Sequence, residues 1–207
     1  MIKRILTPAV AVTLGIAMLF QVGCAGRSQS SSFYVLSPVT DTESGMKKTS
    51  GASSDISIGI SPVSLPKYLK KPQIVTRTGN NELHLAEFDR WAGKIEEDIG
   101  RVIAENLTFF LSTDKVLSYP SMEAIELDYN VTMDISRFEG SLGGRVEFVA
   151  RWAIFDGAGK SVYGVKATHI IEVTGGDGYS DMVAAQSRAL ATFSRELADA
   201  IIQVSSK

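Results

Sequence analysis

The residue of this chain best placed to do chemistry is Cys24, its only cysteine. Lys3 and Arg4 stand near the start, an apolar run covers residues 9–20, and Gly23 directly precedes the cysteine. A basic start, an apolar stretch and a small residue describe an export signal that is cut before Cys24. Bacterial lipoprotein processing attaches a diacylglyceryl group to such a thiol and acylates the freed amine. Several chains of this kind hold a protein on a membrane.

Two other interpretations of this segment stay open. Gln21 stands where lipoproteins usually carry leucine, so one alternative is an ordinary signal peptide with an incidental cysteine. The other is an uncleaved anchor, although the apolar run is shorter than the roughly 20 residues that span a membrane. Ala25 rather than aspartate follows the cysteine, and in Gram-negative lipoproteins this favours the outer membrane, on its periplasmic face.

The histidines and glycines form no recognisable catalytic pattern. His84 and His169 are the only histidines, and each falls in a predicted strand, so a metal site or a Ser-His-Asp triad is a weak interpretation. The run 175–178 is rich in glycine, but Asp177 would repel a phosphate, so a plain loop with a helix cap is expected. No P-loop pattern occurs. We therefore predict a chain that is not an enzyme and binds no cofactor or metal.

The charge and the cysteine usage exclude further classes of partner. The whole sequence carries a formal net charge of −2, and removal of Lys3 and Arg4 with the signal makes the remainder more acidic. No basic stripe is present, so nucleic acid is not an expected partner. With its only cysteine committed to lipid, the exported chain has no disulfide, and its hydrophobic core must stabilise it.

The composition divides the chain into three parts. Residues 1–23 are predicted to be the lipoprotein signal peptide, and the polar, serine-rich residues 24–32 a flexible tether. Residues 33–207 are predicted to form a single domain that begins with a short strand at 33–36. A mobile loop is expected at about 40–55. The alternative for this beginning is a longer tether with one incidental strand.

Hydrophobic periodicity predicts both strands and helices in the domain. Strands are predicted at 56–60, 73–77, 82–87, 115–118, 131–138, 146–154 and 163–173. The turn at 79–81 joins the second and third of them as a hairpin. Apolar residues at helical spacing predict helices at about 93–112 and 180–204, with Ser180 as the N-cap of the second. This order predicts an α+β fold, a single mostly antiparallel sheet with two main helices packed on one face.

The alternation of apolar and polar residues also assigns strand faces. The strand at 56–60 is predicted to be half-buried. Phe138 breaks the alternation of its strand, which indicates a bulge. One face of the last long strand is predicted to carry Tyr163, Val165, Ala167, Ile171 and Val173. The carboxylates, Glu139 and Glu147 among them, are expected by default on the solvated surface.

Several short motifs stand in order between Leu65 and Leu107. They are Leu65-Pro66, Tyr68-Leu69, Pro72–Arg77, Glu82-Leu83, Ala86–Phe88, Asp89–Ala92 and Ala104–Leu107. Together with the opening strand at 33–36, these motifs resemble the PqiC (YmbA-type) family of ABC-transport auxiliary lipoproteins over the whole mature body. The pairs Lys70-Lys71 and Gly93-Lys94 depart from the pattern of that family.

This resemblance implies a lipid-anchored, non-catalytic auxiliary subunit. Such lipoproteins serve systems in which an ABC permease and ATPase drive MCE proteins that carry lipids or other apolar molecules between the inner and outer membranes. The implied role is to dock the periplasmic MCE component at the outer membrane, and a ring-shaped partner would match a homo-oligomeric ring. The alternative is a free-standing envelope lipoprotein that binds an apolar ligand itself. An exported hydrolase is the weakest hypothesis.

The segment Glu87–Trp91 is the best candidate for contact with the partner. Aromatic residues and arginine dominate binding hot spots. The predicted partner-binding residues are Arg77, Phe88, Asp89, Arg90 and Trp91. In this interpretation the three charged residues form a cluster beside Trp91. The equally weighted alternative is that the two aromatic residues pack under the first helix while Arg90 pairs with a nearby acid.

Overall fold

The computed structural model describes residues 29–40, 55–121 and 126–206. Of these, the residues within Ser31–Lys207 belong to one compact unit. The predicted signal peptide, most of the predicted tether and nearly all of the predicted loop at 40–55 lie outside the described residues. Cys24 therefore stays a prediction from the sequence.

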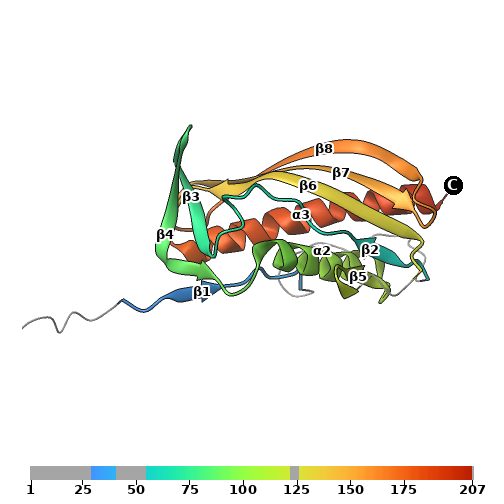
Figure 1. The fold of residues 1–207 in the computed structure, drawn as a ribbon, viewed down its shortest axis with the longest axis horizontal. Helices are drawn as coiled ribbons and strands as arrows, with labels where there is room; N and C mark the ends of the chain where they lie inside the picture. The colour runs from blue at the N-terminus through green and yellow to red at the C-terminus, as the bar shows by residue number, and fades with distance from the viewer. Residues whose placement is uncertain (1–28, 41–54, 122–125, 207) are drawn as a thin grey trace, which may run out of the picture. The chain divides into compact units, whose positions relative to one another are not determined.

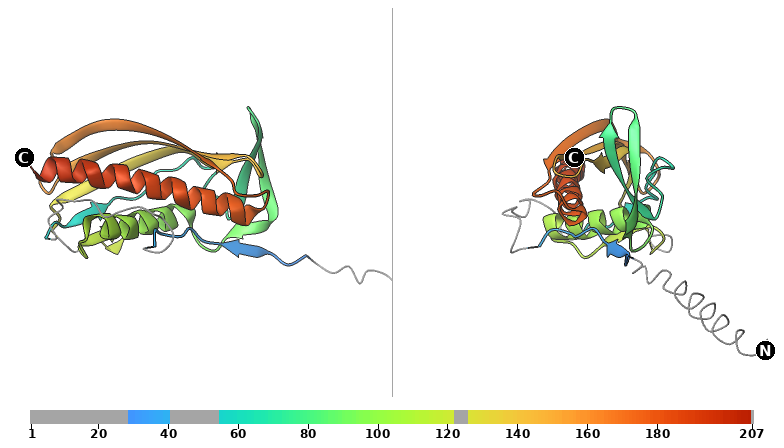
Figure 2. Two further views of the ribbon diagram at one scale, coloured as in Figure 1. Left: turned by 180° about the vertical axis from the view of Figure 1, so that it is seen from behind. Right: turned by 90° about the vertical axis from the view of Figure 1, so that its left-hand side faces the viewer.

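Eight strands form one sheet, and two helices of the described residues pack against it. The elements in chain order are β1 (Ser32–Tyr34), β2 (Ile58–Ile60), β3 (Gln73–Gly79), β4 (Glu82–Trp91), α2 (Ile95–Leu111), β5 (Val116–Ser118), β6 (Tyr129–Gly140), β7 (Arg145–Asp156), β8 (Ser161–Val173) and α3 (Tyr179–Ser205). The sheet curls, and both helices lie on its inner face (Figure 1, Figure 2). The predicted α+β class is confirmed.

The three long strand pairs are antiparallel and contain most of the paired residues, as predicted, whereas four short pairs, including a single contact of β3 with β6, are parallel. The strands β6, β7 and β8 form a meander, and β3 and β4 form the predicted hairpin. The short strands add parallel pairs, because β1 joins β4 while β2 lies between β5 and β6. β5 and β6 flank β2, α2 contacts it, and its middle residue is Gly59, which has no side chain to expose on the other face. All three residues of β2 are therefore buried, and the prediction of a half-buried strand is wrong.

Two bulges set which side chains face the core. The register shifts between Ile135 and Arg137 in β6, which confirms the predicted bulge and returns Phe138 to the core. In β8 the register advances by three residues from Tyr163 to Lys166 while β7 advances by two. The extra residue leaves Tyr163 stacked on Trp152, with ring centroids 5.3 Å apart.

The face assigned to β8 is therefore wrong for its first residue. Val165, Ala167, Ile171 and Val173 are exposed, whereas Tyr163 is half-buried against Trp152. A bulge shifts the side-chain alternation by one residue, so the residues on its two sides change faces. The four exposed apolar residues consequently form a stripe on the outer face of β8, whereas Val162, Tyr163 and Ile170 pack against the core.

The core between sheet and helices contains a group of aromatic side chains. Phe193 of α3 lies 4.8 Å from Phe148 of β7 and 6.2 Å from Trp152, measured between ring centroids. Phe138 of β6 extends the group, 5.9 Å from Phe148. All four side chains are buried, and such large side chains contribute strongly to stability. Among the described residues, no helix has the length and apolar character needed to span a membrane.

Candidate functional site

The predicted partner-binding segment lies at the end of β4, beside the first strand of the unit. β1 runs parallel to β4 and places Phe33 opposite Arg90 and Tyr34 opposite Trp91. The Tyr34 hydroxyl donates a hydrogen bond of 2.7 Å to Asp89 Oδ1. Burial, together with this bond to a carboxylate, raises the pKa of Tyr34. The strand that follows the predicted tether is thus fixed against the predicted segment.

The side chains of this segment differ in exposure. Trp91 is only 7% exposed and belongs to the core, as the packing interpretation expects, and Phe88 is half-buried. Arg90 forms no ion pair with any acid in the described part of the chain. Its Nη2 lies 3.5 Å from the Glu87 carbonyl oxygen, and its buried Nε has no hydrogen-bond partner among the described residues. The predicted local pairing of Arg90 with an acid is therefore wrong.

Arg77 lies at the opposite end of the hairpin from this segment. Arg77 stands opposite Leu83, whereas Arg90 stands opposite Gln73. Arg77 Nη2 forms an ion pair of 2.6 Å with Glu139 Oε1. The structure therefore does not bring Arg77 into the cluster predicted with Asp89 and Arg90, because the extended hairpin separates them.

Glu139 accepts bonds from four groups in a solvent-free position, with its side chain 0% exposed. Its partners are Arg77, the Tyr68 hydroxyl at 3.3 Å, the Phe138 backbone N–H at 3.1 Å and Arg137 Nε at 3.4 Å. Burial and the negative charge of Glu139 raise the pKa of Tyr68. The hydrogen bond to Glu139 is the main cause of the raised pKa of Arg77. The expectation of a solvated Glu139 is wrong, because β3 pairs with the end of β6 and brings Arg77 over it.

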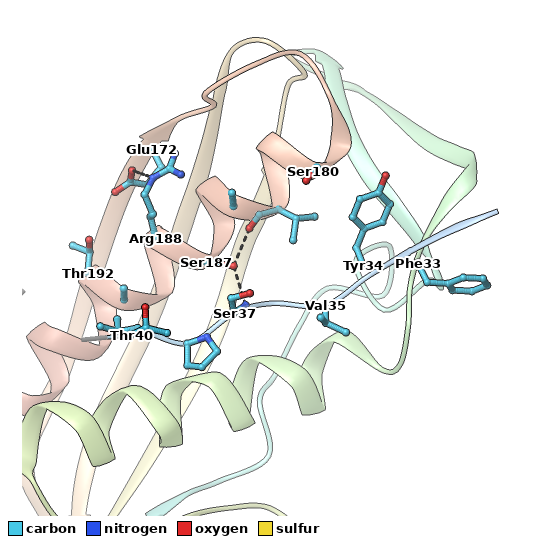
Figure 3. Close-up of a pocket in the computed structure, with 15 residues that line it drawn as sticks. Phe33, Tyr34, Val35, Ser37, Thr40, Glu172, Ser180, Ser187, Arg188 and Thr192 are labelled. Carbon is cyan, nitrogen blue, oxygen red and sulfur yellow. Dashed lines mark hydrogen bonds and ion pairs between the residues drawn. The ribbon is translucent and has the colours of Figure 1, made fainter. Parts of the chain in front are cut away.

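A groove of about 600 Å³ opens between residues 33–40 and α3 (Figure 3). Its apolar lining comes from Phe33, Val35 and Val39 on one side and from Val183 of α3 on the other. Phe33 is 65% exposed. Polar groups border the groove, among them Arg188, whose Nε lies 3.3 Å from Glu172 Oε2. No pattern in the sequence indicated this groove.

Side chains of both helices hold the backbone of residues 36–39. The N–H of Leu36 donates to Asp98 Oδ2 at 2.8 Å, and the N–H of Val39 donates to Asn106 Oδ1 at 2.7 Å. The N–H of Ser37 donates to Ser187 Oγ at 3.1 Å, as Figure 3 shows. Asp98 and Asn106 belong to α2, and Ser187 belongs to α3. We call residues 36–39 the strap, because they cross both helices without joining the sheet.

The chain matches a known protein family over most of its length. The model of the ABC-type transport auxiliary lipoprotein component matches residues 34–198. The chain belongs to this family. The match includes the strap, the hairpin and most of α3. It confirms the resemblance to ABC-transport auxiliary lipoproteins. This auxiliary lipoprotein is therefore a component of an ABC-type transport system, anchored to a membrane of the cell envelope.

Solved structures share the fold of this auxiliary lipoprotein. The crystal structure of an uncharacterized protein has a TM-score of 0.68 and 18% identity, covering 84% of this chain and 99% of the other. A Xanthomonas campestris protein of family DUF330 also has a TM-score of 0.68, with 14% identity, covering 85% and 97%. At these identities the similarity establishes the fold alone. No curated protein matches the chain.

The described residues of the auxiliary lipoprotein contain no evident metal centre. Both histidines are exposed, and His169 Nε2 lies 3.6 Å from Glu147 Oε2. Glu147 itself is half-buried and also pairs with Arg137 Nη1 at 2.5 Å, so its predicted place on the solvated surface is only partly correct. No group of three or more histidine, cysteine, aspartate or glutamate residues suited to a metal occurs in the described ranges.

The glycine-rich loop before α3 is a helix cap. α3 begins at Tyr179, and the backbone N–H of its N-cap, Gly178, donates to Asp181 Oδ2 at 3.2 Å. The prediction of Ser180 as the N-cap is wrong, because the extended backbone ends at Gly178 and Ser180 is already helical. A carboxylate of the chain itself thus occupies the helix end, where it interacts favourably with the helix dipole.

Replacing Asn106 with alanine is expected to loosen the strap. Asn106 is fully buried and also donates to Ser194 Oγ at 3.2 Å. Its loss leaves the half-buried Val39 N–H without its acceptor, whereas Ser194 keeps its bond of 2.7 Å to the Leu190 carbonyl. We expect a loss of about 1–3 kcal/mol in the free energy of unfolding, together with faster hydrogen exchange at the Val39 amide. Ser187→Ala is the control and should change both much less, because it removes the exposed bond to Ser37 and a bond to the Val183 carbonyl within the same helix. Unchanged exchange at Val39 in Asn106→Ala would contradict the role of the strap.

Proposed function

We propose that this chain is the lipid-anchored docking subunit of an MCE-type ABC transport system. It holds the periplasmic MCE component at the outer membrane while lipids or other apolar molecules move between the two membranes. Membership of the auxiliary lipoprotein family supports this proposal, and so do Cys24 and the outer-membrane preference of Ala25. The chain acts by binding and positioning, without catalysing a reaction.

The observation that carries the proposal is the position of β1. This strand directly follows the predicted tether, lies beside Asp89–Trp91 and also lines the groove. The anchored end of the domain and the best candidate surface for the partner are therefore adjacent. Phe33 is an exposed aromatic side chain there, and aromatic residues are enriched at the cores of protein interfaces.

The test is affinity purification of the tagged, lipidated protein from detergent-solubilised envelopes, followed by mass spectrometry. An MCE-domain protein and its permease are expected among the captured proteins. Phe33→Ser should reduce their capture at least several-fold, because Phe33 is exposed beside Arg90. Leu142→Ser, at an exposed position in the turn after β6, is the matched control and should capture as much as the parent. Reproducible absence of both partners from intact, lipidated protein would overturn the proposal.

The second candidate is a free-standing lipoprotein that binds an apolar ligand. The groove favours it, because small-molecule sites have volumes of about 300–1,000 Å³ and mostly apolar linings. A Cys24→Ser variant purified from the periplasm without detergent carries no lipid of its own. Organic extraction of this variant should then yield about one lipid per chain. A lipid-free extract would exclude this candidate.

A further inference from the structure

The strand β8 is an edge of the sheet, since among the described strands it pairs only with β7. The Thr174 N–H donates to the Gly144 carbonyl at 3.0 Å, which fixes the hydrogen-bonding phase of this pair. In an antiparallel ladder, successive residues bond alternately toward the partner and away from it. Ala167, His169 and Ile171 therefore direct their backbone N–H and C=O groups to the open edge.

A hydrogen bond from α3 supports this assignment of outward and inward backbone groups. Val173 belongs to the same alternate set as His169 and Ile171, and its carbonyl oxygen accepts a bond of 2.7 Å from Arg188 Nη2. An arginine of α3 thus satisfies one outward carbonyl at the end of the edge. No described hydrogen bond or strand pairing serves the outward backbone groups of Ala167, His169 and Ile171.

The open edge has little of the usual protection. Monomeric proteins shield edge strands with proline, with bulges, with inward charges or by keeping them short. The two inward charges of this stretch, Lys166 and Glu172, are each neutralised by an ion pair with α3. The bulge of β8 lies before Lys166, and the stretch from Lys166 to Val173 contains neither proline nor glycine. Its outer face is apolar, with Ile171 49% exposed and Val173 71% exposed. Such an edge favours the addition of another strand.

The sequence of this edge is complementary to itself. Antiparallel pairing of two copies centred on His169 sets Ala167 of each copy opposite Ile171 of the other. It also sets Lys166 opposite Glu172, so that opposite charges meet at both ends of the paired stretch. The central pair forms only if the N–H and C=O of His169 point away from β7. The alternation of hydrogen bonds along β8, set by the bond from Thr174 to Gly144, places them in that direction.

We infer that β8 pairs with β8 of a second copy of this chain about a two-fold axis at His169. The contact joins the two sheets through backbone hydrogen bonds, and the apolar outer stripes form cross-strand pairs. Within one chain, Lys166 pairs with Glu196 at 2.8 Å and Glu172 with Arg188. In the pair of copies these two ion pairs meet, and their charges alternate in sign.

A two-fold contact of this kind closes on itself and yields a pair of chains. The ring predicted from the sequence would need a second interface elsewhere on the domain. An extended strand from another protein is the competing occupant of the same edge. Self-complementarity about His169 favours the second copy, because an unrelated strand requires no such symmetry.

The test is disulfide cross-linking of the full-length protein in intact envelopes. His169→Cys places two thiols opposite each other at the axis, where Cα atoms about 5.5 Å apart fit a disulfide. A covalent dimer is expected on mild oxidation. Val173→Cys is the matched control: it lies on the same edge but far from its own copy, so it should give little or no dimer. Cys24 is acylated in the lipidated protein and contributes no free thiol.

A second substitution distinguishes specific pairing of the β8 edges from random encounters between two cysteine-bearing chains. Ile171→Lys adds a charge to the open edge and should lower the dimer yield of His169→Cys at least ten-fold. An unchanged thermal midpoint would show that the domain stays folded. Absence of dimer in His169→Cys, or an equal yield from Val173→Cys, would overturn the inference. Cross-linking of His169→Cys to a different protein would instead assign the edge to that partner and equally overturn the pairing of copies.

Discussion

Replacing Cys24 with alanine is expected to move nearly all of the protein from the membrane fraction to the soluble periplasmic fraction. Acyl chains contribute about 0.8 kcal/mol for each buried CH₂ group, so two or three chains bind a membrane almost irreversibly. Among the described residues no helix is suited to span a membrane, and the sequence places Cys24 before the predicted domain at 33–207. The variant should therefore be released as a folded protein that no longer supports envelope integrity.

Quantitative immunoblotting of fractionated cells measures this release. Ala25→Asp is the matched variant, because it keeps the acylated cysteine and changes only the sorting residue. It should stay in the membrane fraction and move from the outer to the inner membrane. Membrane retention of Cys24→Ala would contradict anchoring through this thiol, and normal envelope integrity with the released form would contradict the need for an anchor.

Replacing Glu139 with alanine is expected to cause the largest loss of stability of any single charged residue described above. Its carboxylate is fully buried and pairs with Arg77, which is itself three-quarters buried. Removing one member of a buried ion pair leaves the other without compensation and costs about 3–5 kcal/mol. Partial exposure of Arg77 and Arg137 lets water reach them, so the lower end of this range, about 3 kcal/mol, is expected.

Urea unfolding of the soluble domain gives the free energy directly. Glu105→Gln is the control, because it removes an exposed ion pair of 2.7 Å with Arg101 and should change stability little. Glu139→Gln retains an acceptor for the Phe138 N–H and should lie between the two. Equal stability of Glu139→Ala and Glu105→Gln would mean that Arg77 finds another partner when Glu139 is absent.

Local patterns in the sequence predicted most elements of the fold. The helices α2 and α3 and the hairpin of β3 and β4 follow from periodicity and turn residues, which depend on neighbours in sequence. The burial of β2 and of Glu139 depends on which distant strands pair, namely β2 with β5 and β6, and β3 with β6. Such pairings leave no local signal. In β8, one extra residue in a bulge was enough to take Tyr163 off the face predicted for it.

The candidate site was only partly predictable for the same reason. The motif Asp89–Trp91 is visible in the sequence, and the structure indeed sets it beside β1. The groove depends on a segment whose backbone bonds to Asp98, Asn106 and Ser187, three side chains far away in sequence. Polar side chains at helical positions give no indication that they bind a distant backbone. The groove and the strap therefore required the structure.

The strap also determines how a load would travel through the molecule. Because β1 is paired with β4 and residues 36–39 are bonded to α2 and α3, tension on the proposed lipid anchor would pass first into the edge of the sheet and then into the helix pair. The predicted tether, residues 24–32, would then set the distance between membrane and domain. At about 3.3–3.6 Å per extended residue, these residues would span at most about 30 Å. With the proposed anchor, the domain would work within a shallow layer next to its membrane, and the proposed partner that spans the periplasm would have to reach it.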